Sequence, residues 1–130
     1  MNKIIATTAL LLVASCGNGV RLAPVDYADA GTTAIAIATP GLIEGNPVIA
    51  SAGPAAPLAA LALKVGVKQA FVAGGMEVER ANRLVETGSA FGFCNNTALL
   101  LGANTGVGLA LGAICAMIYL DNGGQIDVHP

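Results

Sequence analysis

The stretch Asn96 to Leu120, NTALLLGANTGVGLALGAICAMIYL, decides the fold class of this chain. It has 25 residues, and its only ionisable side chains are Cys115 and Tyr119. An apolar run of this length is enough to cross a bilayer as a tilted helix. Tyr119 lies near its end, where an aromatic residue suits the boundary between lipid and water. The stretch therefore predicts a transmembrane helix.

The composition of the whole chain agrees with a membrane protein. Of its 130 residues, 55% are apolar and only 11% are charged, whereas a soluble domain has about 25% charged residues. The net charge of −2 provides no basic surface for nucleic acid. We therefore expect an all-α fold: a small helical membrane protein with two to three membrane helices, the lipid bilayer as its partner and no cofactor.

Two shorter apolar segments precede this stretch, at residues 29–43 and 54–75. In the first, Asp29 could cap the N-terminus of a helix, and Pro40-Gly41 is expected to kink or end that helix. The charged block 76–88 is expected to be a solvated loop or a helix extension. The predicted organisation is a signal peptide at 1–15, a tether loop at 16–28, a helical membrane domain at 29–120 and a polar tail at 121–130.

The N-terminus has the pattern of a bacterial export signal. Lys3 provides a positive charge, and Ile4 to Val13 form an apolar segment too short to span a bilayer. The sequence Val13-Ala14-Ser15-Cys16 resembles the lipobox of bacterial lipoproteins, which implies lipidation of Cys16 after cleavage just before it. The alternatives are an uncleaved signal anchor, or an ordinary signal peptide with a chance cysteine. Either way, the N-terminus is expected to be exported.

The remaining cysteines, Cys94 and Cys115, are expected to be inert packing residues. The three cysteines of the chain have no metal-ligand spacing, so no metal site is predicted. No Ser-His-Asp arrangement or paired carboxylates suggest a catalytic site. We therefore expect no catalytic residues, and a soluble enzyme is the weakest interpretation.

Lys64 and Lys68 are four residues apart and share one helix face. An ionised Lys near the centre of a bilayer costs about 2.5–3.5 kcal/mol on insertion scales. Each therefore needs a partner, or a shallow position from which its ammonium reaches water. The acids nearest to the apolar segments are Asp29 and Glu44. The hypothesis is that these four residues form an intramembrane charge set that packs the first segment on the second.

The third segment contains Gly102-x-x-x-Gly106 and Gly108-x-x-x-Gly112. Small residues at this spacing allow another helix to approach closely. The contact is expected either within the chain or between copies in a homo-oligomer. Two asparagines of the run, Asn96 and Asn104, could add hydrogen bonds between helices.

Two motifs resemble those of a family of small uncharacterised prokaryotic membrane proteins with about three spanning helices. The motifs are Asp29-x-x-Thr32-Thr33 and Gly41-x-x-Glu44-x-Asn46-Pro47. A lysine in the second helix, here Lys64, and an asparagine in the third, here Asn95 or Asn96, are also similar. The resemblance covers roughly residues 26–105 and implies a topology, but no biochemical activity.

Charge asymmetry favours a hairpin with two membrane crossings. If segment 29–43 spans, an exported Cys16 places Arg80 and Arg83 outside, against the positive-inside tendency. If that segment is instead re-entrant or interfacial, the two arginines are cytoplasmic. Only these two arginines decide between the topologies, since the acids of the same block hardly count under the rule.

Three functions fit these features. The leading expectation is a non-enzymatic membrane (lipo)protein, structural or assembling in a bacterial envelope or in the membrane of a bacterial virus. The second is a lysis or membrane-permeabilising protein of such a virus. The third is a small channel or ion-coupled transporter subunit that uses the charge set. All three place the chain in a bacterial or host-cell membrane.

Overall fold

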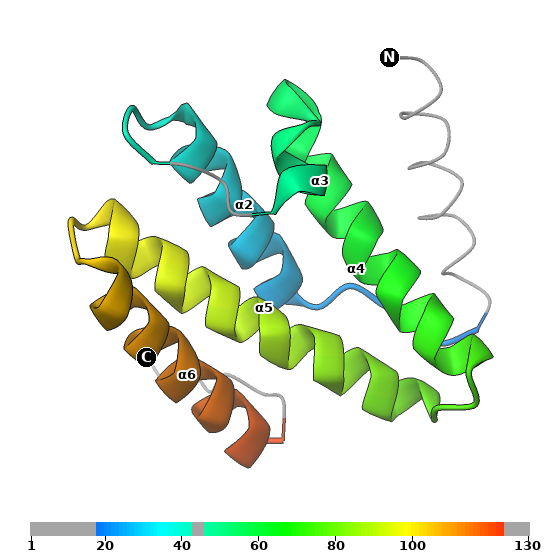
Figure 1. Ribbon diagram of the computed structural model, residues 1–130. Coiled ribbons are helices and arrows are strands. Elements are labelled where there is room, and N and C mark those ends of the chain that lie inside the picture. Colours follow the sequence, from blue (N-terminus) through cyan, green and yellow to red (C-terminus); the bar gives the residue numbers. More distant parts are fainter. Residues whose placement is uncertain (1–17, 43–45, 124–130) are drawn as a thin grey trace.

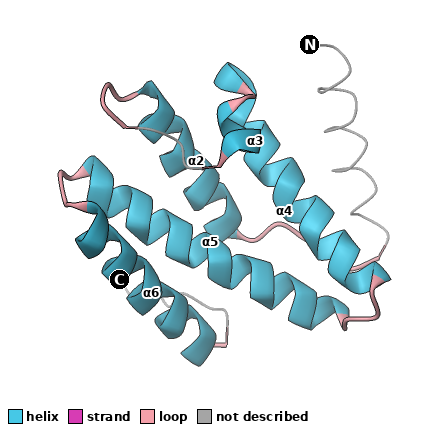
Figure 2. Ribbon diagram, viewed as in Figure 1, coloured by secondary structure: helices cyan, strands magenta, loops and turns pink. Residues whose placement is uncertain are grey.

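The computed structural model describes residues 18–42 and 46–123, and this part of the chain is all-helical, with no strand. The all-α prediction is confirmed. The ribbon in Figure 2 shows helices joined by short turns. In chain order the elements are α2 (Pro24–Ala38), α3 (Pro47–Ala50), the 3-10 turn η2 (Gly53–Ala55), α4 (Ala56–Ala73), α5 (Val78–Leu100) and α6 (Thr105–Asp121).

The long helix α5 is the centre of the structure. It packs against α6 on one side and against α2 and α4 on the other, and α2 also packs against α4 (Figure 1). The charged block 76–88 is therefore mostly helical, because it forms the first turns of α5. Side chains of α2, α4 and α6 can therefore meet those of α5.

Helix α2 begins at Pro24, not at Asp29. Asp26 accepts a hydrogen bond from the backbone N–H of Ala23 (2.9 Å), which is the one half of a capping box that an alanine at the N-cap allows. Pro24 occupies the first turn, where a missing N–H does no harm. The predicted tether loop is thus helical from Pro24 onward. The predicted end is close: α2 stops at Ala38, just before Pro40-Gly41.

The stretch 96–120 is not one continuous helix. Its first residues complete α5, which ends at Leu100, and the rest form α6 from Thr105. Gly102 adopts a left-handed φ of 88° in the turn between them. Asn104 then caps α6 by accepting a hydrogen bond from the N–H of Val107 (3.0 Å). The prediction of one continuous helix over this stretch is wrong, because Gly102 and Asn104 form a turn within it.

The helix that meets the length and apolarity of a membrane crossing is instead Gly53–Ala73, which joins η2 to α4. It has 21 residues, and only 22% of its most apolar window is buried against the rest of the chain. Helix α6 is apolar but shorter, at 17 residues. One described helix therefore qualifies as a membrane span by length and composition.

Polar side chains occupy part of the interior, and many large apolar side chains are exposed. Four of the five largest fully buried side chains are polar or charged: Lys68, Asn82, Asp26 and Ser89. Large apolar side chains lie on the outside instead, most densely on α6, where they are Val107, Leu109, Leu111, Ile114, Met117, Ile118 and Leu120. A helix that is apolar on all sides normally lies in a protein core or in lipid.

Candidate functional site: a buried ionic network and a polar pocket

Lys68 of α4 is fully buried at the centre of the helix bundle. Its ammonium donates to Asp26 Oδ2 (2.8 Å), to Glu86 Oε1 (3.4 Å) and to the backbone oxygen of Arg21 (2.7 Å). A lysine has three donors, and these three acceptors use all of them. A buried charge is tolerable only when it is paired and hydrogen-bonded in this way.

The second oxygen of each carboxylate is also bonded. Ser89 of α5 donates to Asp26 Oδ1 (2.6 Å), and Tyr119 of α6 donates to Glu86 Oε2 (2.9 Å). Tyr119 is thus buried in the interior, 3% exposed, and its predicted position at a membrane boundary stays a prediction. The network joins α2, α4, α5 and α6 through side chains.

Lys64 continues the network towards solvent. Its Nζ atom lies 2.6 Å from Asp29 Oδ2 and 2.7 Å from Ser89 Oγ. The two charged side chains are each 14% exposed, so they are partly accessible. Ser89 connects the two ion pairs, because its hydroxyl accepts from Lys64 while it donates to Asp26.

The structure brings together part of the charge set suggested by the sequence. Lys64 and Asp29 are paired, whereas Lys68 pairs with Asp26 and Glu86. Glu44 lies outside the described residues. The network also contains three residues that the sequence analysis did not single out, Asp26, Glu86 and Ser89.

A signal for these residues was present in the sequence. Asp26 and Asp29 are three residues apart, and so are Glu86 and Ser89, while the two lysines are four apart. Such spacings place both members on one helix face. Three helices with a polar pair on a single face indicate that these faces meet.

A polar pocket of about 270 Å³ opens beside the pair of Lys64 and Asp29. Residues from α2, α3, α4 and α5 and the segment before α3 contribute to its lining, and they are Asp29, Thr33, Asn46, Ile49, Ala60, Leu63, Lys64, Gly92 and Asn96. Asn96 donates towards the hydroxyls of Thr32 (3.4 Å) and Thr33 (3.3 Å). Charged, hydroxyl and amide groups therefore converge on one hollow.

Gly92 allows α2 and α5 to approach at this pocket. A Cβ atom at this position would overlap the carboxylate of Asp29. The absence of a side chain on α5 is therefore required for Asp29 to lie where Lys64 reaches it.

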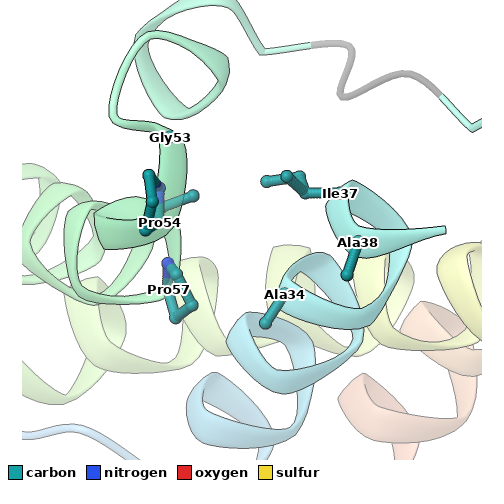
Figure 3. A pocket seen from close by; sticks show the side chains of 7 residues that line it. Ala34, Ile37, Ala38, Gly53, Pro54 and Pro57 are labelled. Atoms are coloured by element: carbon teal, nitrogen blue, oxygen red, sulfur yellow. The ribbon is translucent and has the colours of Figure 1, made fainter. Parts of the chain in front are cut away.

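A second pocket, of about 300 Å³, lies between the C-terminal end of α2 and the start of α4. In Figure 3, Gly53, Pro54 and Pro57 face Ile37 and Ala38 across the gap. Its lining side chains are all apolar, so the pocket has no side chain that could hold a charge or perform acid–base chemistry.

Cys94 and Cys115 form a disulfide between α5 and α6. The expectation that both are inert packing residues is wrong. The two helices run side by side (Figure 1), so cysteines 21 residues apart in the chain come to face each other. Disulfides persist mainly in exported proteins. Cys16 and the predicted lipobox lie outside the described residues.

Only two of the four glycines predicted to pack helices, Gly108 and Gly112, lie where two helices meet. A Cβ at Gly108 would lie 2.8 Å from Asn95 Oδ1, and a Cβ at Gly112 would lie 2.9 Å from the backbone oxygen of Phe91. These two glycines therefore allow α6 to approach α5 within the chain. Gly102 belongs to the turn, and Gly106 meets only the capping side chain of Asn104.

An ion pair on the surface ties the segment before α2 to the start of α5. The two terminal guanidinium nitrogens of Arg21 donate to the carboxylate of Glu79, at 2.8 and 3.0 Å. The hydrogen bond from Arg21 lowers the pKa of Glu79. Next to it, Asn82 donates to the backbone oxygen of Gly19 (3.1 Å).

Comparisons with family models, with curated proteins and with solved structures found no match to this chain. The resemblance to a family of small membrane proteins therefore stays a prediction. Among the residues that the structure describes, no group of His, Cys, Asp or Glu side chains is placed to hold a metal ion. The candidate site is thus defined by its geometry: a buried ionic network that ends in a polar pocket.

Proposed function

We propose that this chain is a small integral membrane protein of a bacterial or host-cell envelope, with a structural or assembly role. The exposed apolar surface around a buried ionic network carries the proposal. Large apolar side chains lie exposed along α6, while Lys68 and Asp26 are fully buried. Lipid can cover such an outer surface without the need for polar groups. Ion pairs inside the helix bundle keep the charged side chains out of contact with lipid.

Two further observations support an exported location. The N-terminal pattern around Cys16 is that of a lipoprotein signal, and the disulfide between Cys94 and Cys115 suits an oxidising compartment. If a homo-oligomer forms, it uses a face of α6 other than Gly108 and Gly112, because α5 already covers these two glycines.

Fractionation of cells that express the full chain tests the membrane proposal. We expect the protein in the membrane fraction, resistant to alkaline carbonate and released only by detergent. Met117→Arg, on the exposed face of α6, should reduce the carbonate-resistant fraction. Its matched control is Arg80→Gln at an exposed polar position, which should leave that fraction unchanged. A wild-type chain that stays monomeric in buffer without detergent would contradict the proposal.

The second candidate function is a subunit of a small channel or ion-coupled transporter. It is favoured by the ion pair of Lys64 and Asp29, which is partly exposed at a pocket and linked through Ser89 to buried Asp26 and Lys68. Intramembrane ionisable residues commonly mark ion or substrate pathways.

Flux measurements in liposomes that contain the purified chain test this second function. We expect flux of protons or ions that is lost in Lys64→Gln and in Asp29→Asn. Gly88→Ala is the control, since a Cβ there meets no atom within 4 Å. Flux that is equal in the wild type and in both charge variants would refute the function.

A further inference from the structure

We propose that the polar pocket beside Lys64 and Asp29 binds a small zwitterion with an ammonium and a carboxylate on the same carbon, as in a free α-amino acid. The inference names the ligand for the second proposed function. It rests on that proposed function for the choice of this pocket as the site. It does not require that the chain transports the ligand.

The charges at the pocket select against ligands of a single charge. The ammonium of Lys64 and the carboxylate of Asp29 are 2.6 Å apart, and both line the pocket. A simple cation that approached Asp29 would meet the repulsion of Lys64, and a simple anion at Lys64 would meet that of Asp29. A ligand that carries both charges side by side satisfies both residues.

The donors and acceptors needed for such a ligand are present. Of the three donors of Lys64, Asp29 and Ser89 take two, so a third can donate to a ligand carboxylate. The ligand ammonium can donate to the carboxylate of Asp29 and to the hydroxyl of Thr33, which lines the same pocket. Binding thus adds two charge-assisted hydrogen bonds beside the ion pair of Lys64 and Asp29.

The pocket also limits the size and the side chain of the ligand. At about 270 Å³ it holds about nine groups of the size of a water molecule, each occupying ~30 Å³. Its apolar wall consists of Ile49, Ala60 and Leu63. Gly92 lets the carboxylate of Asp29 lie against α5, where it lines the pocket. This volume has room for a free α-amino acid, and the apolar wall suits an apolar side chain such as that of alanine.

Titration calorimetry on the full chain in detergent micelles tests the ligand. The probes are L-alanine, ethylammonium, which has the positive charge alone, and propionate, which has the negative charge alone. We expect saturable binding of L-alanine and affinities at least about tenfold weaker for the two singly charged probes. Asp29→Asn and Lys64→Gln should each weaken L-alanine binding by about tenfold or more, and Gly88→Ala should leave it unchanged.

Either of two results would overturn the inference: no binding of L-alanine by the folded wild type, or equal affinity for ethylammonium or propionate. The probe series on the wild type does not depend on any variant folding. Binding of L-alanine without flux in liposomes refutes transport and supports the site. Flux without L-alanine binding refutes the ligand and leaves transport standing.

Discussion

The hydroxyl of Tyr119 donates a hydrogen bond of 2.9 Å to Glu86, and both side chains are 3% exposed. Tyr119→Phe removes the donor and leaves a buried carboxylate oxygen without that partner. We expect the free energy of unfolding in detergent to fall by about 1–3 kcal/mol. Tyr27→Phe is the matched control at an exposed tyrosine and should change it little. Equal effects of the two variants would contradict the buried bond.

The position of Gly92 leads to a second prediction. Gly92→Ala places a methyl group against Asp29 and should lower the free energy of unfolding by about 1–3 kcal/mol. Gly88→Ala lies one turn away with open space around it, and should raise the same free energy by up to about 1 kcal/mol through helix propensity. Unfolding curves of the two variants in detergent measure the difference. Opposite signs are expected, and a gain of stability in Gly92→Ala would refute the contact.

The disulfide between α5 and α6 gives a third prediction. Cys94 and Cys115 are 21 residues apart, so removing the bond should lower the free energy of unfolding by about 3 kcal/mol. The double substitution Cys94→Ser with Cys115→Ser measures this loss. Mass spectrometry after alkylation provides the direct check: in the denatured protein both thiols should react only after reduction. Alkylation of both without a reductant would show that the bond is absent.

The pair of Arg21 and Glu79 predicts a dependence on pH. Because the pKa of Glu79 is lowered in the folded state, its stabilising effect is present above the unfolded pKa. This effect is lost as the pH falls through the folded pKa. Both side chains are about half exposed, so the effect is small and decreases with salt. Glu79→Gln should flatten the acidic limb of the stability profile.

The control for this profile is Glu77→Gln, since Glu77 is exposed and takes part in none of the ion pairs among residues 18–42 and 46–123. Unfolding midpoints between neutral and acidic pH, at low and high salt, provide the comparison. An acidic limb of the same slope in Glu79→Gln and in the wild type would argue against the pair.

Membrane sidedness supplies a fifth prediction. The contacts of Arg21 with Glu79 and of Gly19 with Asn82 place the segment before α2 beside the start of α5. Asn18→Cys and Arg80→Cys should therefore react with a membrane-impermeant maleimide from the same side of intact cells. Reaction from opposite sides would contradict these contacts. If the two positions share one side, an exported N-terminus places Arg80 outside the membrane. That arrangement disagrees with the hairpin that the charge asymmetry favours.

The helical class and the pairing of Lys64 with Asp29 could be reached from the sequence, because apolar composition and charge burial are local arguments. The break at Gly102 and Asn104 was missed because an apolar run outweighed two turn residues within it. Asp26 and Glu86 were missed because they lie in segments that look solvated. Their partners come from other helices, and the only sequence signal for these contacts was the spacing of the polar pairs on each helix face.

The position of Lys68 between two acids has a consequence for the order of assembly. Asp26 precedes it by 42 residues, whereas Glu86 follows 18 residues later. During synthesis α4 therefore emerges with one counter-ion already made and the other still to come. If the helices enter a bilayer, we expect α2 and α4 to enter as a pair joined by Asp26 and Lys68. Helix α5 then brings Glu86 as the second counter-ion of Lys68.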